Sequence, residues 1–234
     1  SLLRQQSIRK TLRSQEQNQS KRDNMRGRLF DAVALGATLA APINVAMKFE
    51  QSMAKVGAVS RASEADLGKL TKTARELGAT TNWSASEAAD GMQFLAMAGF
   101  KTEQTIAAMP GMLNLASAGA TDLGRTADIA SNILSGFNLK AEDMGRLGDV
   151  LTNAFTSSNT NLEMLGDTMK YVAPFAAAAN VSLEQTAAMA GKLGDQGLQG
   201  AQAGTALRAI ITRLQAPTSA AAKMLEQLGV KTVD

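Results

Sequence analysis

The stretch that decides the fold is Ser84–Glu103, which reads SASEAADGMQFLAMAGFKTE. Ser84 is followed three residues later by Glu87, which is the capping-box pattern of a helix N-terminus. A short turn at residues 99–102 contains a glycine and an apolar residue, and Glu103 then stands where a second helix would begin. An acidic residue is favourable there because the helix dipole is positive at its N-terminus. The stretch therefore predicts two consecutive helices joined by a tight turn.

The same arrangement recurs twice further along the chain. A second unit begins near Asp122, turns at 136–139 and resumes near Glu142, and a third begins near Asn161 and turns at 180–182. Glutamates stand at the three second-helix starts, 39 and 42 residues apart, and they are Glu103, Glu142 and Glu184. A period near 40 residues is compatible with a helical solenoid. Helical hairpins that resemble one another by chance are the alternative.

Helical patterns flank these units on both sides. Upstream, Ser63 is a candidate N-cap, Gly78 a candidate stop, and the apolar residues between them share one helix face, namely Leu67, Leu70, Ala74 and Leu77. Downstream, a partial fourth unit carries an apolar helix that Pro217 is expected to end, and Ser219 is expected to cap the next helix. We therefore expect the helical pattern to run through most of the chain.

The composition also favours an all-α protein. Apolar residues make up 45% of the chain and aromatic residues only 4%. Strands favour β-branched and aromatic residues, whereas unbranched and small side chains suit closely packed helices. We predict antiparallel helical hairpins in a loosely repeated, solenoid-like or bundle arrangement, with an extended helix at the N-terminus.

Cysteine and histidine are both absent from the chain. Disulfides are therefore excluded, zinc and haem lack their usual ligands, and the commonest general base is missing. No cofactor or metal site is expected. An enzyme becomes less plausible, although a hydrolase that works with two carboxylates stays open, since Glu163 and Asp167 stand one helical turn apart. Solvated helix faces explain that pair more simply.

Positive charge is concentrated at one end of the chain. Residues 1–28 carry a net charge of +6, which leaves −3 for residues 29–234. We predict a basic, polar helical extension over 1–28, either a solvated helix or the end of a longer rod, with no signal-peptide pattern. The body of the chain is not a broad nucleic-acid surface, and no specific nucleic-acid site is expected.

An apolar, Ala/Gly-rich helical segment is predicted over 29–57. Its residues 32–47 contain no charge, but the run is shorter than the roughly 20 residues of a spanning helix and is broken by Pro42. A buried or self-associating segment is the first interpretation, and membrane insertion is the alternative. The side chains concerned are Leu29, Val33, Leu35, Leu39, Ile43 and Val45.

The least usual local feature is a run of glycines, most of them three residues apart, namely Gly191, Gly194, Gly197, Gly200 and Gly204. It lacks the spacing of a P-loop or of a dinucleotide fold. Glycine permits close backbone approach between helices or subunits, at a cost of about 1 kcal/mol each in a helix. We therefore interpret the run as a packing or interface site, and predict that a free monomer holds residues 191–204 poorly.

Two arginines follow the glycines on an apolar helix over 205–215. Arg208 and Arg213 could bind a carboxylate of a partner, because a guanidinium forms two parallel hydrogen bonds with a carboxylate. Exposure on the polar face of the helix is the alternative. Trp83 and Tyr171 are interpreted as core or interface residues, because single aromatic residues do not form a nucleic-acid site.

Several blocks in the same order resemble the tail tape measure proteins of long-tailed phages, the minor tail protein family. They are Phe49–Val59 (FEQSMAKVGAV), Leu77–Ala89 (LGATTNWSASEAA), and Gly204–Arg208 (GTALR) with Arg213 and Leu214 after it. The resemblance covers about 46–230, and residues 58–234 are interpreted as its helical core. It is carried by several ordered blocks together, while residues 1–45 match less well.

The resemblance implies a long structural protein, of which this chain is a part. Such a protein lies in the lumen of the tail tube near the baseplate, after assembly in the host cytoplasm. It helps to set tail length and leaves ahead of the genome. The partners implied are copies of itself, the tail tube protein, baseplate or tail-tip hub proteins and tail assembly chaperones, with host membrane contact during ejection. A membrane-active ejection component and a helical-repeat peptide-binding module are the competing functions.

Overall fold

The computed structural model describes residues 43–229, and within that range all regular secondary structure is helical. The predicted all-α class is therefore confirmed. Contacts divide the chain into Ser1–Lys48 and Phe49–Asp234. Most of the first unit, including the predicted basic extension, lies outside the described residues.

Residues 43–60 are helical, and in the second unit Phe49, Met53 and Val56 are buried. Helix α2 (Glu64–Thr80) follows. Its N-cap is Ser63, as predicted, and its buried face contains Leu70, Ala74 and Leu77. The prediction that Gly78 stops this helix is wrong, because α2 continues to Thr80. A Cβ at position 78 would lie 2.5 Å from the backbone nitrogen of Ala85, so this glycine permits close contact between helices instead.

The predicted helix pairs are confirmed with small shifts at their boundaries. They are α3 (Ala85–Met97) with α4 (Thr102–Gly119), α5 (Leu123–Gly136) with α6 (Met144–Thr156), and α7 (Leu162–Ala178) with α8 (Leu183–Asp195). The predicted capping box of Ser84 with Glu87 is present, and Ser182 forms a second capping box with Gln185. Before α6, a short 3₁₀ turn η1 (Ala141–Asp143) occupies the predicted helix start.

The partial fourth unit consists of α9 (Gly200–Gln215) and α10 (Ser219–Gln227). The prediction that Ser219 caps α10 is wrong. The hydroxyl of Thr218 accepts the hydrogen bond from the backbone nitrogen of Ala221, and Ser219 is the first helical residue. No residue of α10 is buried.

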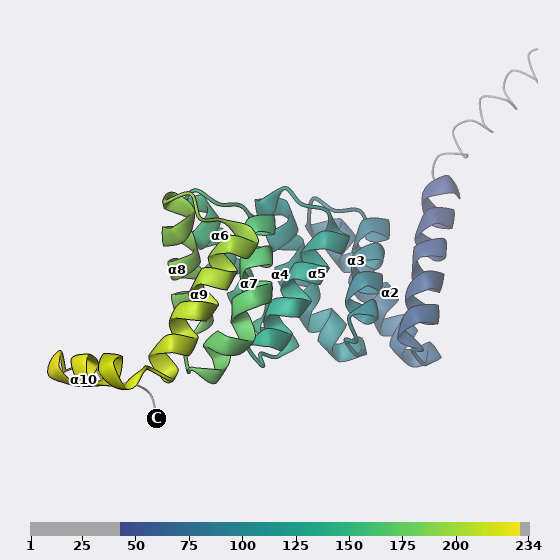
Figure 1. The fold of residues 1–234 in the computed structure, drawn as a ribbon. Helices are drawn as coiled ribbons and strands as arrows, with labels where there is room; N and C mark the ends of the chain where they lie inside the picture. Colours follow the sequence, from purple (N-terminus) through teal and green to yellow (C-terminus); the bar gives the residue numbers. More distant parts are fainter. Residues whose placement is uncertain (1–42, 230–234) are drawn as a thin grey trace, which may run out of the picture. The chain divides into compact units, whose positions relative to one another are not determined.

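The helices of the second unit contact one another in a regular order (Figure 1). One series of contacts runs from α2 to α3, α5, α7 and α9, and a second runs from α4 to α6 and α8. Each helix also contacts its neighbour in sequence from α2 to α9. Tight turns between consecutive helices place them antiparallel, and the apolar side of each faces the space between the two series. The predicted sequence repeat stays a prediction.

The core between the two series is rich in leucine and methionine. Its largest fully buried side chains include Met92, Met109, Met112, Leu147 and Leu151. Burying such a side chain contributes about 1.5–3 kcal/mol relative to exposure. Methionine fills irregular gaps between closely spaced helices because its side chain is unbranched and flexible. The shortage of aromatic residues is therefore compatible with a continuous core.

Candidate functional site

The glycine run extends from α8 through the following loop into α9. Gly191 and Gly194 belong to α8, Gly200 is the first residue of α9, and Gly204 lies within α9. Gly197 and Gly200 have positive φ angles of 82° and 56°. Positive φ is costly for residues that carry a Cβ. The run thus supplies two backbone conformations that favour glycine and three positions inside helices.

The three helical glycines face backbone or small side chains of neighbouring elements. A Cβ at Gly191 would lie 2.8 Å from the hydroxyl of Ser158, and one at Gly194 would lie 2.9 Å from the carbonyl oxygen of Asn159. At Gly204 the distance to the carbonyl oxygen of Thr168 would be 2.5 Å. Each distance is shorter than a normal contact, so these positions admit no larger residue without movement of the neighbouring helix or loop.

Polar contacts reinforce the same junction. The hydroxyl of Thr168 donates to the carbonyl oxygen of Gly200 at 3.0 Å. The backbone nitrogen of Asn159 donates to the carboxylate of Asp195 at 2.8 Å, and the amide of Gln199 donates to the carbonyl oxygen of Asn159. The side chains of Asp195 and Gln199 therefore tie the loop after α6 to the end of α8 and the loop that follows it.

The two candidate arginines differ in their surroundings. The guanidinium of Arg208 lies over the ring of Phe175, 4.2 Å from its centroid. This cation–π contact joins α9 to α7. Arg213 is exposed on α9. The suggested pairing of either arginine with a partner's carboxylate remains a prediction.

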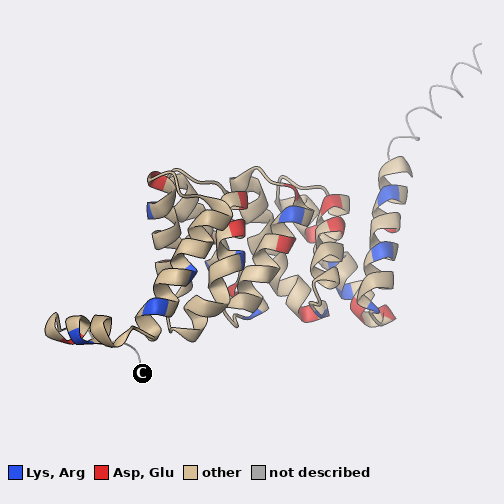
Figure 2. Ribbon diagram, in the orientation of Figure 1, with Lys and Arg blue, Asp and Glu red and all other residues tan. Residues whose placement is uncertain are grey.

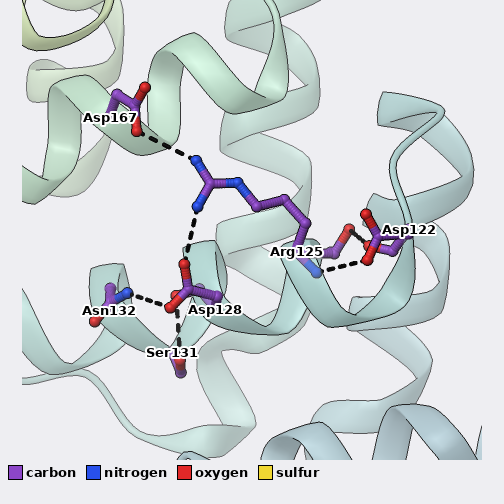
Figure 3. Close-up of polar contacts among 7 residues, drawn as sticks. Asp122, Arg125, Asp128, Ser131, Asn132 and Asp167 are labelled. Atoms are coloured by element: carbon purple, nitrogen blue, oxygen red, sulfur yellow. Dashed lines mark hydrogen bonds and ion pairs between the residues drawn. The ribbon is translucent and has the colours of Figure 1, made fainter.

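A second polar cluster lies on the outer side of α5 and α7 (Figure 3). The guanidinium of Arg125 forms ion pairs with Asp128 at 3.0 Å and with Asp167 at 3.2 Å. The carboxylate of Asp122 accepts from the backbone nitrogen of Arg125, and Asp128 also accepts from the amide of Asn132. These groups are largely exposed, so the cluster positions two helices and adds only modestly to stability.

Two more ion pairs join elements that are distant in sequence. Lys69 on α2 contacts Glu103 on α4 at 2.6 Å, which raises the pKa of Lys69. Arg146 on α6 donates to both carboxylate oxygens of Glu184 on α8, at 2.7 and 3.0 Å. That bidentate contact lowers the pKa of Glu184 from 4.5 to about 2. Two of the three repeated glutamates thus contact a neighbouring helix besides standing at a helix start.

The two carboxylates considered for a hydrolase differ in their surroundings. Asp167 forms an ion pair with Arg125, whereas Glu163 is exposed on α7. Within residues 43–229, no group of three or more carboxylates could hold a metal ion. Charged residues of both signs are scattered over the helices in Figure 2.

The apolar segment predicted over 29–57 is described only from residue 43. Ile43 and Val45 are exposed by 55% and 66%. Leu29, Val33, Leu35 and Leu39 lie outside the described residues. Among the helices described, none combines the length and apolar character needed to cross a membrane.

The fold and these surfaces define the class of the protein. It is an all-α protein built from two contacting series of helices, with small residues where the helices meet. Residues 71–234 match the family model described as phage-related minor tail protein. The chain belongs to that family.

Two curated relatives are similar over most of the chain. The tape measure protein of Pneumococcus phage Dp-1 is 40% identical over 195 residues, which are 83% of this chain and 17% of the relative. The probable tape measure protein of Escherichia phage P2 is 35% identical over 189 residues, 81% of this chain and 23% of the relative. The chain thus spans about a fifth of each relative's length. No solved structure matches it.

Proposed function

We propose that this chain is the helical core of a tape measure protein, and that it acts in a phage or prophage-derived tail as an assembly component, without enzymatic activity. The family match over 71–234 carries this proposal, together with the identity to two proteins named as tape measure proteins. The protein would take part in tail length determination, tail tube and baseplate assembly, and genome ejection. It would lie in the tail lumen of the virion and pass through the host cytoplasm during assembly.

The geometry favours an anchor or assembly module over the ruler itself. As one continuous helix, 234 residues would measure about 350 Å at 1.5 Å per residue. The turns after α3, α5 and α7 reverse the direction of the chain instead. The described residues therefore form packed helices and do not extend the chain along one axis. We propose that residues 58–234 contact copies of the same protein, the tail tube, the baseplate hub or the assembly chaperones.

Deletions in the complete phage protein test this division of labour. Removing stretches upstream of residue 58 that carry the ruler should shorten tails in proportion to the residues removed. Removing α5 and α6 should abolish tail assembly, because the contacts from α3 to α7 depend on them. Tail lengths measured by electron microscopy decide the matter, and normal tails of reduced length from the second deletion would contradict the proposal.

A further inference from the structure

The outer surface of α4 and of the C-terminal half of α6 is poor in charge, whereas the N-terminal half of α6 exposes Arg146 and Asp149. Residues 104–121 contain no Asp, Glu, Lys or Arg, and neither do residues 150–162. Many of these residues are nevertheless exposed. In the other series, α5 and α7 expose Asp128, Glu163, Asp167 and Lys170, and the N-cap residue Asp122 of α5 is exposed as well. Depletion of charge from an exposed surface is typical of the central part of a protein interface.

Two adjacent hollows mark this surface. One, of about 470 Å³, lies between α4 and α6 and is lined by Asn114, Thr152 and small residues such as Gly111. The other, of about 320 Å³, lies between α6 and α8. The two share a wall formed by Asp149 and Asn153 of α6. Because the lining side chains are short, the surface stays hollow where longer residues would fill it.

The amide and hydroxyl side chains that line the hollows favour a ligand with unpaired backbone N–H and C=O groups. Asparagine amides both donate and accept hydrogen bonds, and threonine hydroxyls do the same. An extended polypeptide presents unpaired N–H and C=O groups along its length, whereas a helix has already paired them internally. An anion is disfavoured, since Asp149 and Glu184 both contribute carboxylates to the hollows.

The charges of the hollows add a preference for a basic side chain. Glu184 is engaged by Arg146, but Asp149 forms no ion pair with any residue in 43–229. Asp149 also lies at the shared wall, so a segment that crosses both hollows would pass it. A Lys or Arg of that segment would find an uncompensated carboxylate there.

We propose that the two hollows over α4, α6 and α8 bind an extended polypeptide segment that places a Lys or Arg opposite Asp149. Neighbouring helix axes lie about 8–10 Å apart, so three helices span roughly 20 Å. About six extended residues cover that distance. This proposal goes beyond a role in tail assembly and does not depend on it, because binding can be measured on the isolated chain.

An array of randomised peptides, each about eight residues long, tests the proposal with the full chain. Bound sequences should be enriched in Lys or Arg at one position and depleted in Asp and Glu. Asp149→Asn should abolish that enrichment and weaken binding of the selected basic peptides by about five-fold, the scale of an exposed ion pair. Asn153→Ala should weaken binding of all selected peptides, because it removes the amide shared by both hollows.

The matched control is Glu163→Gln, which removes the same charge from the exposed face of α7 and should leave the enrichment unchanged. Circular dichroism confirms that each variant is folded. The proposal fails if the array yields no enriched sequences, if Asp149→Asn and Glu163→Gln behave alike, or if labelled single-stranded DNA binds as tightly as the selected peptides.

Discussion

Gly204 and Gly68 are both helical glycines, but their surroundings differ in the space available for a methyl group. A Cβ at Gly204 would meet the carbonyl oxygen of Thr168 at 2.5 Å and the Cβ of Tyr171 at 2.9 Å. At Gly68, on the exposed side of α2, nothing lies within 4 Å of such an atom. The same substitution should therefore have opposite effects at the two positions.

Gly204→Ala should lower the free energy of unfolding by about 1–3 kcal/mol, because α9 must move away from α7. Gly68→Ala should raise it by about 0.5–1 kcal/mol, since alanine loses less conformational freedom in a helix. Urea unfolding followed by circular dichroism measures both. Equal effects at the two positions would show that the close approach of α9 to Thr168 is absent in solution.

Glu184 gives the structure a predictable response to acid. Its pKa is about 2 in the folded chain, against an ordinary value of 4.5, because Arg146 donates hydrogen bonds to the carboxylate. A lowered pKa in the folded state means that the stability from this pair is present above pH 4.5 and is lost as the pH falls toward 2. Between pH 4.5 and pH 2, the free energy of unfolding should therefore fall further in the wild-type protein than in Glu184→Gln.

Urea midpoints of the two proteins, measured above pH 4.5 and again near pH 2, test this expectation. Glu163→Gln is the control for removal of an exposed carboxylate that forms no such bidentate contact. Both Arg146 and Glu184 are partly exposed, so the difference should shrink at high salt. A difference between wild type and Glu184→Gln that stays constant with pH would contradict the bidentate contact.

At the scale of the elements, a single turn geometry ends several helices. A residue with positive φ follows the helix, and the backbone nitrogen of the next residue donates to the carbonyl five residues earlier. The pairs are Phe100 to Leu95, Thr121 to Ala116, Leu139 to Leu134, Val181 to Ala176 and Leu198 to Leu193. The positive-φ residue is glycine or asparagine in four of these turns and alanine, at Ala120, in the fifth.

Replacing Ala120 with glycine should therefore stabilise the folded protein. Its φ of 47° is unfavourable for a residue with a Cβ, by about 1–2 kcal/mol. Ala120→Gly should raise the free energy of unfolding by about 1 kcal/mol. Ala107→Gly, in the interior of α4, should lower it by about 0.5–1 kcal/mol. Thermal unfolding of both variants compares them, and destabilisation by Ala120→Gly would contradict the left-handed turn.

At the scale of the whole molecule, the two series of helices are open at their last members. Helix α8 contacts α6, α7 and α9, and α9 contacts α7 and α8. The helix that follows them, α10, buries none of its residues. Ile210 and Leu214 of α9 are each 49% exposed. In stacked helical architectures each unit is stabilised by its neighbours, so terminal units open more readily than central ones.

Hydrogen exchange of the dilute monomer should reflect this gradient. Amides of α10 should exchange fastest, those of residues 191–204 at an intermediate rate, and those of α4 and α5 slowest, because the central helices bury the most complete core. Self-association should slow exchange in residues 191–204 if they form an interface between copies. Protection of 191–204 in the monomer equal to that of α4 would contradict the prediction.

The sequence by itself determined the helical class, the helix pairs and most helix starts. These features depend on neighbouring residues, as in the capping box of Ser84 and Glu87 or the glycine turn at 99, so they can be recognised without knowledge of distant contacts. The glycine run at 191–204 also stands out in the sequence, because its composition departs from that of a normal helix. Its role as an interface stays a prediction.

The tertiary structure alone decided which local signals prevailed. Gly78 lies inside α2 and not at its end, and Pro110 and Pro174 lie inside α4 and α7 although proline disfavours a helix interior. Packing of the apolar faces offsets those local costs. The pairing of Arg146 with Glu184 and the hollows beside Asp149 depend on which helices lie side by side, and that information is held in contacts between residues far apart in the chain.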